Sequence, residues 1–209
     1  MHYAGNIEQT EGPHTWEEFL DLDEQDRREL IDGEFVEVEV PGAEHEYTVA
    51  QLIYYLIGWA KPRRAGEIYA SGYKVRISDK RGVMPDLQYF SKDNPHRRQP
   101  RAISAGRPDL AVEIHSPESG RYDRVTKLNW YASIGVPEYW IVDPFAYTLQ
   151  QLILKEGRYV VFASIAGSTI FRPETFPGLE IPLADLWVGD RGLLPGGAEN
   201  PPEGEPLES

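Results

Sequence analysis

A strand at 109–115, a helix at 122–134 and a second strand at 138–143 follow one another directly, and this order constrains the fold most. Apolar residues alternate in both strands, while Gly135 stands where a helix C-terminus is expected. The helix is expected to present one apolar face, formed by Val125, Leu128, Tyr131 and Ala132. Such a unit resembles the right-handed crossover between two parallel strands. The sequence therefore predicts an α/β fold.

The N-terminal third predicts a short helix, a hairpin and a long helix. Thr15 followed by Glu18 forms a capping box at the start of TWEEFLDL. The Asp32-Gly33 pair suits a tight turn within RELIDGEFVEVEV. Apolar residues at helical spacing run through EHEYTVAQLIYYLIGWA, and we expect Pro62 to end that helix.

Further strands complete the predicted sheet. One is expected at 67–77 and another at 83–90, followed by the polar loop KDNPHRRQPRAISAGRP. A second hairpin is expected at 147–164 and a last apolar segment at 178–187. Together these elements predict one domain, residues 15–188, with a mixed β-sheet flanked by helices and with N-terminal and C-terminal hairpins.

Acidic residues are concentrated at the two ends of the chain, whose net charge is −13. Residues 1–26 carry eight acidic residues and no Lys or Arg, and residues 190–209 carry five with one Arg. We expect residues 1–14 to be a flexible tail. Residues 189–209 are rich in Pro, Gly and Glu, so we expect a disordered acidic tail there.

The segment 61–107 is basic, with twelve Lys or Arg residues against four acidic ones. These charges are either solvated on loops and exposed strand faces, or they form a basic surface suited to a phosphate backbone. Under the second interpretation the DNA-contacting residues are Lys61, Arg63, Arg64, His96, Arg97, Arg98 and Arg101.

The composition excludes several classes of protein. Cys is absent, which excludes disulfides, thiolate zinc sites and Cys nucleophiles and fits the cytoplasm. No apolar run approaches the roughly 20 residues that span a bilayer, and no signal-peptide pattern is visible. No Gly-rich loop joins a strand to a helix, which disfavours a nucleotide cofactor. We expect a cytoplasmic protein without a membrane partner.

Carboxylates occupy strand positions where apolar side chains are expected. Asp109 and Glu113 share a strand face but lie about 13 Å apart, too far for one small ion. Asp86 is a better partner for Glu113, because adjacent strands lie about 5 Å apart and facing carboxylates can share Mg²⁺ or Mn²⁺. The structural alternatives are a backbone-bonded Asp86 and an Arg-paired Glu113. We expect Asp109 to be structural.

Lys127 and His115 are further candidates for such a site. Lys127 lies on the helix after the Glu113 strand, where a cation can act near an attacking water. Its alternative role is an ordinary helical pair with Asp123, four residues earlier. His115 either lines the site, ligates the metal or fills a partly polar core position.

The order of these motifs resembles the Uma-two family of restriction endonucleases, a bacterial family of the PD-(D/E)XK nuclease superfamily. The matching phrases are TWEEFLDL, RELIDGEFVEV, EHEYTVAQLIYYL, MPDLQYF, RPDLAVEIHSPES, YDRVTKLNWYASIGVPEYWIVDP and FPGLEIPLADLW. The resemblance implies a restriction-endonuclease-like core and a Mg²⁺- or Mn²⁺-dependent endodeoxyribonuclease, a hydrolase.

The resemblance also implies roles for individual residues. Asp86 matches the Asp of the PD motif, and Glu113 matches the acidic residue of the following strand. The superfamily lysine would fall at residue 115, which is His here, and the implied lysine is Lys127. An acidic residue in the N-terminal hairpin and a His early in the next helix correspond to Glu34 (or Glu29) and His45.

Three functions are compatible with these residues. The first is a DNA endonuclease in which Asp86 and Glu113 hold the metal and Lys127 orients the water. The second is a catalytically silent nucleic-acid-binding or scaffold protein with the same fold. The third is a nuclease acting on RNA or branched DNA. A homodimer is expected by analogy, because cutting two strands usually takes two sites.

Overall fold

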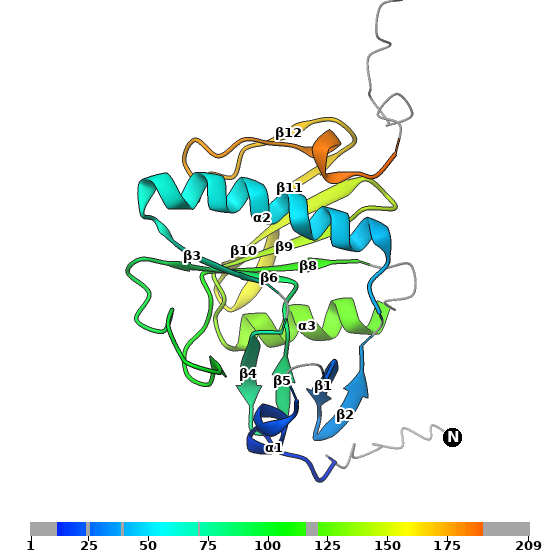
Figure 1. The fold of residues 1–209 in the computed structure, drawn as a ribbon, viewed down its shortest axis with the longest axis vertical. Helices are drawn as coiled ribbons and strands as arrows, with labels where there is room; N and C mark the ends of the chain where they lie inside the picture. The colour runs from blue at the N-terminus through cyan, green and yellow to red at the C-terminus, as the bar shows by residue number, and fades with distance from the viewer. Residues whose placement is uncertain (1–11, 24–25, 39, 71, 116–120, 190–209) are drawn as a thin grey trace, which may run out of the picture.

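The computed structural model describes residues 12–23, 26–38, 40–70, 72–115 and 121–189 (Figure 1). Its helices are α1 (Trp16–Asp21), α2 (Ala43–Arg63), α3 (Arg121–Ser133) and the one-turn 3₁₀ helix η1 (Leu183–Leu186). The first seven strands are β1 (Arg28–Ile31), β2 (Glu34–Glu37), β3 (Gly66–Ala70), β4 (Lys74–Ser78), β5 (Arg81–Val83), β6 (Leu87–Ser91) and β7 (Ala102–Ile103). The remaining strands are β8 (Leu110–Ile114), β9 (Glu138–Asp143), β10 (Thr148–Lys155), β11 (Arg158–Ala166), β12 (Ile170–Phe171) and β13 (Ile181–Pro182).

The described strands form two main sheets and a short ribbon. One sheet has six strands in the order β11-β10-β9-β8-β6-β3, and the other has five in the order β2-β1-β5-β4-β7. Strands β12 and β13 pair separately. Figure 1 shows α2 along one face of the six-stranded sheet and α3 between its other face and the five-stranded sheet. Helix α3 is therefore enclosed between the two sheets.

The alternation of side chains along β8 assigns each residue to one of two cores. Leu110, Val112 and Ile114 belong to the core that includes the buried residues of α2. Ala111 belongs to the core around α3. Because successive side chains of a strand point to opposite faces, Glu113 shares the α3 side with Ala111. Glu113 is only 8% exposed, so its carboxylate lies inside the protein.

The strand–helix–strand unit is confirmed. Strands β8 and β9 pair in parallel with α3 between them in the chain, and Gly135 follows the helix with φ +79°. The Thr15–Glu18 capping box is present at α1. The hairpin turns at 32–33 and 156–157 connect antiparallel strands, as predicted. The mixed α/β fold class is thus confirmed.

Two strand predictions were wrong, because each covers two strands in different sheets. The predicted strand at 67–77 divides at Gly72, whose φ is +96°, into β3 and β4. The predicted strand at 83–90 divides around Pro85 into β5 and β6. Side-chain alternation continues through both breaks, so the pattern could not show that the chain changes sheets there. The polar loop also contains β7, which pairs in parallel with β4.

Two details of the helices also differ from prediction. Pro62 does not end α2, which continues to Arg63 and closes with Arg64 in the left-handed conformation. A proline this close to the C-terminus removes one hydrogen bond without stopping the last turn. Val125 is 55% exposed, and the buried face of α3 carries Lys127 instead. Which residues of α3 are buried depends on how the helix packs between the two sheets.

The described part of the chain begins against the first hairpin. The backbone N–H groups of Gly12 and His14 donate to the carbonyl oxygens of Asp32 and Gly33 at 2.7 and 2.9 Å. Of the tails predicted at 1–14 and 189–209, residues 1–11 and 190–209 lie outside the described residues, and Gly12 and His14 are hydrogen-bonded to the first hairpin. Within the described residues, no helix has both the length and the apolar character to cross a bilayer.

Candidate active site

Lys127 joins a carboxylate of each sheet. Its Nζ lies 3.1 Å from Oε1 of Glu29, on β1, and 3.2 Å from Oε2 of Glu113, on β8. The three residues are 5%, 2% and 8% exposed, respectively, so the contacts are shielded from water. One ammonium group on α3 therefore bridges the five-stranded and six-stranded sheets through their acidic side chains.

Asp86 lies beside this group, directly before β6. Strands β6 and β8 are antiparallel neighbours, and the pairing of Leu87 with Val112 places Asp86 opposite Glu113. This is the adjacency that the sequence analysis expected. Asp86 Oδ2 accepts a hydrogen bond from the Ile114 N–H at 2.7 Å, and Oδ1 lies 3.2 Å from Nε2 of His45. Helix α2 thus contributes a residue of its first turn to the cluster.

Tyr131 is a member of the cluster that the sequence analysis assigned only to an apolar face. Its hydroxyl donates a hydrogen bond to Glu113 Oε1 at 2.5 Å, and the residue is fully buried. It lies one helical turn after Lys127, so both side chains project from the same face of α3. That four-residue spacing was the signal in the sequence. Together the two residues hold both oxygens of the Glu113 carboxylate.

Burial dominates the electrostatics of Glu113. It raises the pKa of the carboxyl to about 8, against an ordinary value of 4.5. The Lys127 ammonium opposes this rise, Asp86 and Glu29 add to it, and the Tyr131 hydrogen bond lowers the pKa. Burial and the nearby Glu113 carboxylate also raise the pKa of the Tyr131 phenol well above its ordinary value. Below about pH 8 the Glu113 carboxyl therefore favours its protonated form.

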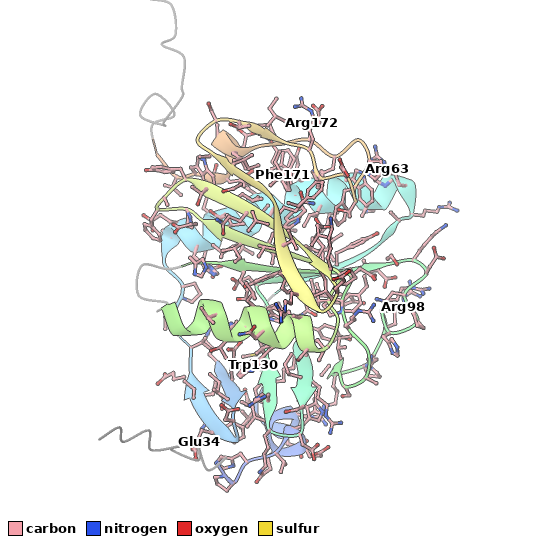
Figure 2. All side chains as sticks on the ribbon, turned by 180° about the vertical axis from the view of Figure 1, so that it is seen from behind. Glu34, Arg63, Arg98, Trp130, Phe171 and Arg172 are labelled. Carbon is pink, nitrogen blue, oxygen red and sulfur yellow. The ribbon has the colours of Figure 1, made fainter. Side chains whose placement is uncertain are left out.

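The structure distinguishes between the two acidic candidates of the first hairpin. Glu29 reaches Lys127, and its Oε1 also accepts a hydrogen bond from the Met84 N–H at 2.9 Å. Glu34 is exposed on β2, next to Gly12. Figure 2 shows Glu34 at the hairpin end of the molecule. Of the pair, Glu29 is the one brought to the cluster.

Three other sequence candidates are placed as follows. The carboxylate of Asp109 accepts hydrogen bonds from the Ser91 N–H at 2.7 Å and the Asn94 side chain at 3.0 Å, which confirms a structural role. His115 is buried one residue beyond β8, with its N–H donating to the Val142 carbonyl at 2.8 Å. Its three suggested roles stay open. The side chain of Asp123 lies outside the described residues.

The basic candidates are not brought to the carboxylate cluster. Arg63 lies 18 residues after His45 on α2, about 27 Å along the helix. Arg98 pairs with Glu67 at 2.5 Å, and Arg101 pairs with Asp21 at 3.1 Å. Figure 2 shows Arg63 and Arg98 on the same side of the molecule. Lys61 and Arg64 are exposed beside Arg63, and Arg97 lies 3.8 Å from Glu67.

The donor chemistry of the cluster fits a divalent cation. Among the described residues no three His, Asp or Glu side chains already converge on a metal position. Asp86 and Glu113 nevertheless offer carboxylate oxygens, the donors that Mg²⁺ and Mn²⁺ prefer, and Mg²⁺ usually keeps several waters. The raised pKa of Glu113 shows that additional positive charge would favour its ionised form. Asp86 and Glu113 therefore fit a Mg²⁺ or Mn²⁺ ion that has few protein ligands and keeps several waters.

A mixed sheet, with a buried cluster of a lysine and carboxylates between it and a second sheet, is consistent with a restriction-endonuclease-like α/β protein. The family model of Uma2, described as "Putative restriction endonuclease", matches residues 16–184, and the chain belongs to this family. The match supports a nuclease function.

The fold is similar to that of a solved structure. It is described as "a putative nuclease belonging to DUF820 from Anabaena variabilis ATCC 29413". The similarity has a TM-score of 0.68 at 21% sequence identity, and it covers 83% of this chain and 97% of that chain. Among curated proteins the comparison found no match.

Proposed function

We propose that this chain is a metal-dependent DNA endonuclease that hydrolyses phosphodiester bonds. The observation that carries the proposal is the contact of Lys127 with Glu113, beside Asp86, in a chain of the Uma2 family. A buried cation next to two carboxylates on neighbouring strands is costly to fold, since desolvation opposes every charge in it. Such an arrangement is typical of a site with a chemical task.

The carboxylates of Asp86 and Glu113 would hold Mg²⁺ or Mn²⁺. When bound, the ion supplies Lewis-acid stabilisation of the phosphoryl oxygens and a more acidic water. The His45 ring restrains one oxygen of Asp86, and the Ile114 N–H restrains the other. The metal-holding side chains are thereby fixed before substrate arrives.

Lys127 is the residue proposed to act on the reacting groups. Its ammonium orients the attacking water and stabilises the negative charge that develops on the phosphorus oxygens. Few water molecules reach the group, so its electrostatic effect is stronger than in bulk solvent. Tyr131 is a positioning residue, because it acts through Glu113.

The basic surface is proposed to contact the DNA backbone away from the cleaved bond. The separation of about 27 Å along α2 corresponds to about eight base pairs of duplex. Arg63 and Arg64 at that end carry charge on exposed side chains. Contacts there would position the duplex without determining the sequence that is cut.

Cleavage of supercoiled plasmid tests the proposal directly. Wild type, Glu113→Gln and Lys127→Ala are compared in Mg²⁺, Mn²⁺ or EDTA, with Lys155→Ala as the exposed-lysine control. We expect metal-dependent nicking by wild type and Lys155→Ala, and loss of at least a hundredfold in the other two. Loss in Glu113→Gln alone would contradict the role of Lys127 while keeping the metal site.

The two alternative functions predict different results in the same experiment. A catalytically silent protein would neither cleave DNA nor bind Mn²⁺ in calorimetry. A nuclease for RNA or branched DNA would bind Mn²⁺ and cleave those substrates but not plasmid. A substrate panel of duplex, single-stranded and branched DNA and of RNA separates the two outcomes.

A further inference from the structure

Helix α2 presents a stripe without charge to solvent. A surface helix ordinarily carries charged residues on its exposed face. Between Glu46 and Lys61 this helix has no charged residue at all. Within the interval Tyr47, Tyr54 and Ile57 are 37%, 71% and 40% exposed, and Ala50 and Gly58 are exposed beside them. These five residues recur at helical spacing and define the α2 stripe.

The other sides of α2 have contacts within the chain. Leu52 and Leu56 are buried in the core shared with the six-stranded sheet. The Thr48 hydroxyl donates to the Leu186 carbonyl at 2.8 Å, and the Trp59 Nε1–H donates to the Pro177 carbonyl at 3.0 Å. The Tyr55 hydroxyl donates to Asp185. In the described part of the chain, the α2 stripe is therefore the exposed side of a helix whose remaining sides are packed.

We propose that the α2 stripe binds a second copy of this chain, with the two helices antiparallel about a two-fold axis at Tyr54. In such a pair, residues equally far from the axis lie opposite one another. Ala50 then faces Gly58 of the partner subunit, and Glu46 lies opposite Pro62 of the partner subunit, one residue from Lys61 of the partner subunit. Opposite charges meet at both ends of the seam, and the small residues allow the helices to approach closely.

The charge order favours a copy of this chain over an unrelated apolar partner. The acidic residue stands at the N-terminal end of the stripe and the basic residue at its C-terminal end. An identical helix running in the opposite direction matches both. A hollow of about 230 Å³ adjoins the stripe, lined by Ile57, Ala60, Lys61 and residues 66–69 of β3. The two-fold axis brings Tyr47 of the partner subunit to this hollow.

The dimensions of the seam indicate a weak dimer. From Glu46 to Lys61 the helix rises about 22 Å, so the contact is smaller than the interfaces of permanent complexes. Its apolar centre and charged ends resemble the core and rim of a specific interface. The dimer is therefore expected to depend on protein concentration.

Sedimentation velocity of the full chain, from about 1 to about 200 µM, tests the proposal. Wild type is expected to shift from monomer to dimer across this range. Tyr54→Lys places two ammonium groups at the axis and is expected to weaken the dimer at least tenfold. Val125→Lys, at a 55% exposed helical position on α3, is the matched control and should behave like wild type. A wild type that stays monomeric, or an unchanged dimer in Tyr54→Lys, would overturn the proposal.

A charge swap tests the antiparallel arrangement. Glu46→Lys and Lys61→Glu should each weaken the dimer several-fold, because each brings like charges together. The double variant should recover association, since the opposite charges are restored across the axis. The two residues are about 22 Å apart within one helix, so the recovery would come from the contact between copies. A double variant as weak as the single variants would overturn the arrangement.

Discussion

At the residue scale, Lys127 forms ion pairs with Glu29 on one sheet and with Glu113 on the other. Among the described contacts of the cluster, no other charged side chain contacts both sheets. We expect Lys127→Met to lower the free energy of unfolding by about 3 kcal/mol, because Glu29 and Glu113 then remain buried without a cation. Urea denaturation measures the loss, and Lys155→Met is the exposed control. Adding Glu29→Gln to Lys127→Met should recover part of the stability. A loss no larger than that of the control would contradict the bridging role.

The variant Tyr131→Phe tests whether the hydrogen bond from Tyr131 to Glu113 affects metal binding. The Tyr131 hydroxyl lowers the pKa of Glu113, so Tyr131→Phe should raise that pKa further. A proton then competes with the metal at higher pH, and the pH dependence of Mn²⁺ binding should shift upward. Calorimetric titrations between pH 6 and 9 measure the shift.

The control for Tyr131→Phe is Tyr159→Phe, which removes a partly buried hydroxyl that donates to the Val136 carbonyl at 2.8 Å. Tyr159→Phe should lower stability without moving the pH dependence. If both variants bind Mn²⁺ with the wild-type pH profile, Tyr131 has only a structural role.

At the scale of the elements, Glu29 lies on β1 of the first hairpin, and Gly12 packs against the turn of that hairpin. Gly33 has φ +79°, and a Cβ there would lie 2.3 Å from the Gly12 carbonyl oxygen. Gly157 has nearly the same φ, +77°, with nothing within 4 Å of its Cβ position. We expect Gly157→Ala to cost about 1 kcal/mol of turn strain and Gly33→Ala clearly more.

Thermal unfolding of Gly33→Ala and Gly157→Ala compares the two losses of stability. The two glycines have nearly the same φ, but Gly12 packs against Gly33 and not against Gly157. Gly33→Ala should also reduce metal-dependent activity, since β1 carries Glu29. Equal losses of stability would show that the contact with Gly12 contributes nothing.

The elements also show what the sequence could predict. The unit β8–α3–β9 follows from local patterns, because alternation and helical spacing are visible within each segment. The breaks at Gly72 and Pro85 separate strands of different sheets, and no local pattern reveals which sheet a strand joins. Asp86 and Glu113 could be paired from strand order, whereas the partners of Lys127 depend on how α3 lies between the sheets.

The burial of Glu138, a carboxylate outside the candidate site, also could not be predicted from the local sequence pattern. Glu138, at the start of β9, is 2% exposed and accepts hydrogen bonds from the Trp140 and Gln151 side chains at 2.6 and 2.7 Å. Its burial could not be foreseen from a strand of aromatic and β-branched residues. Neutral donors satisfy Glu138, whereas Glu113 is surrounded by charged groups. The surroundings, and not burial alone, distinguish the candidate site residue.

At the scale of the whole molecule, Glu113 couples folding to protons and to metal. Its pKa is about 8 in the folded chain and 4.5 ordinarily, so between these values the folded chain binds the proton more strongly. The stability that this group contributes is fully present below pH 4.5 and is lost as the pH rises through 8. In EDTA, the Tm of wild type should therefore fall relative to Glu113→Gln between pH 6 and pH 8.

A divalent cation should reverse this trend, because it replaces the proton as the partner of the carboxylate. Saturating Mn²⁺ is expected to raise the Tm of wild type by about 5–10 °C at pH 8, and by less at pH 6, where the proton competes. Glu113→Gln should respond little at either pH. Differential scanning calorimetry of both proteins at the two pH values, with Mn²⁺ or EDTA, measures all of these differences. A Mn²⁺ response of the same size in Glu113→Gln would place the bound metal elsewhere in the molecule.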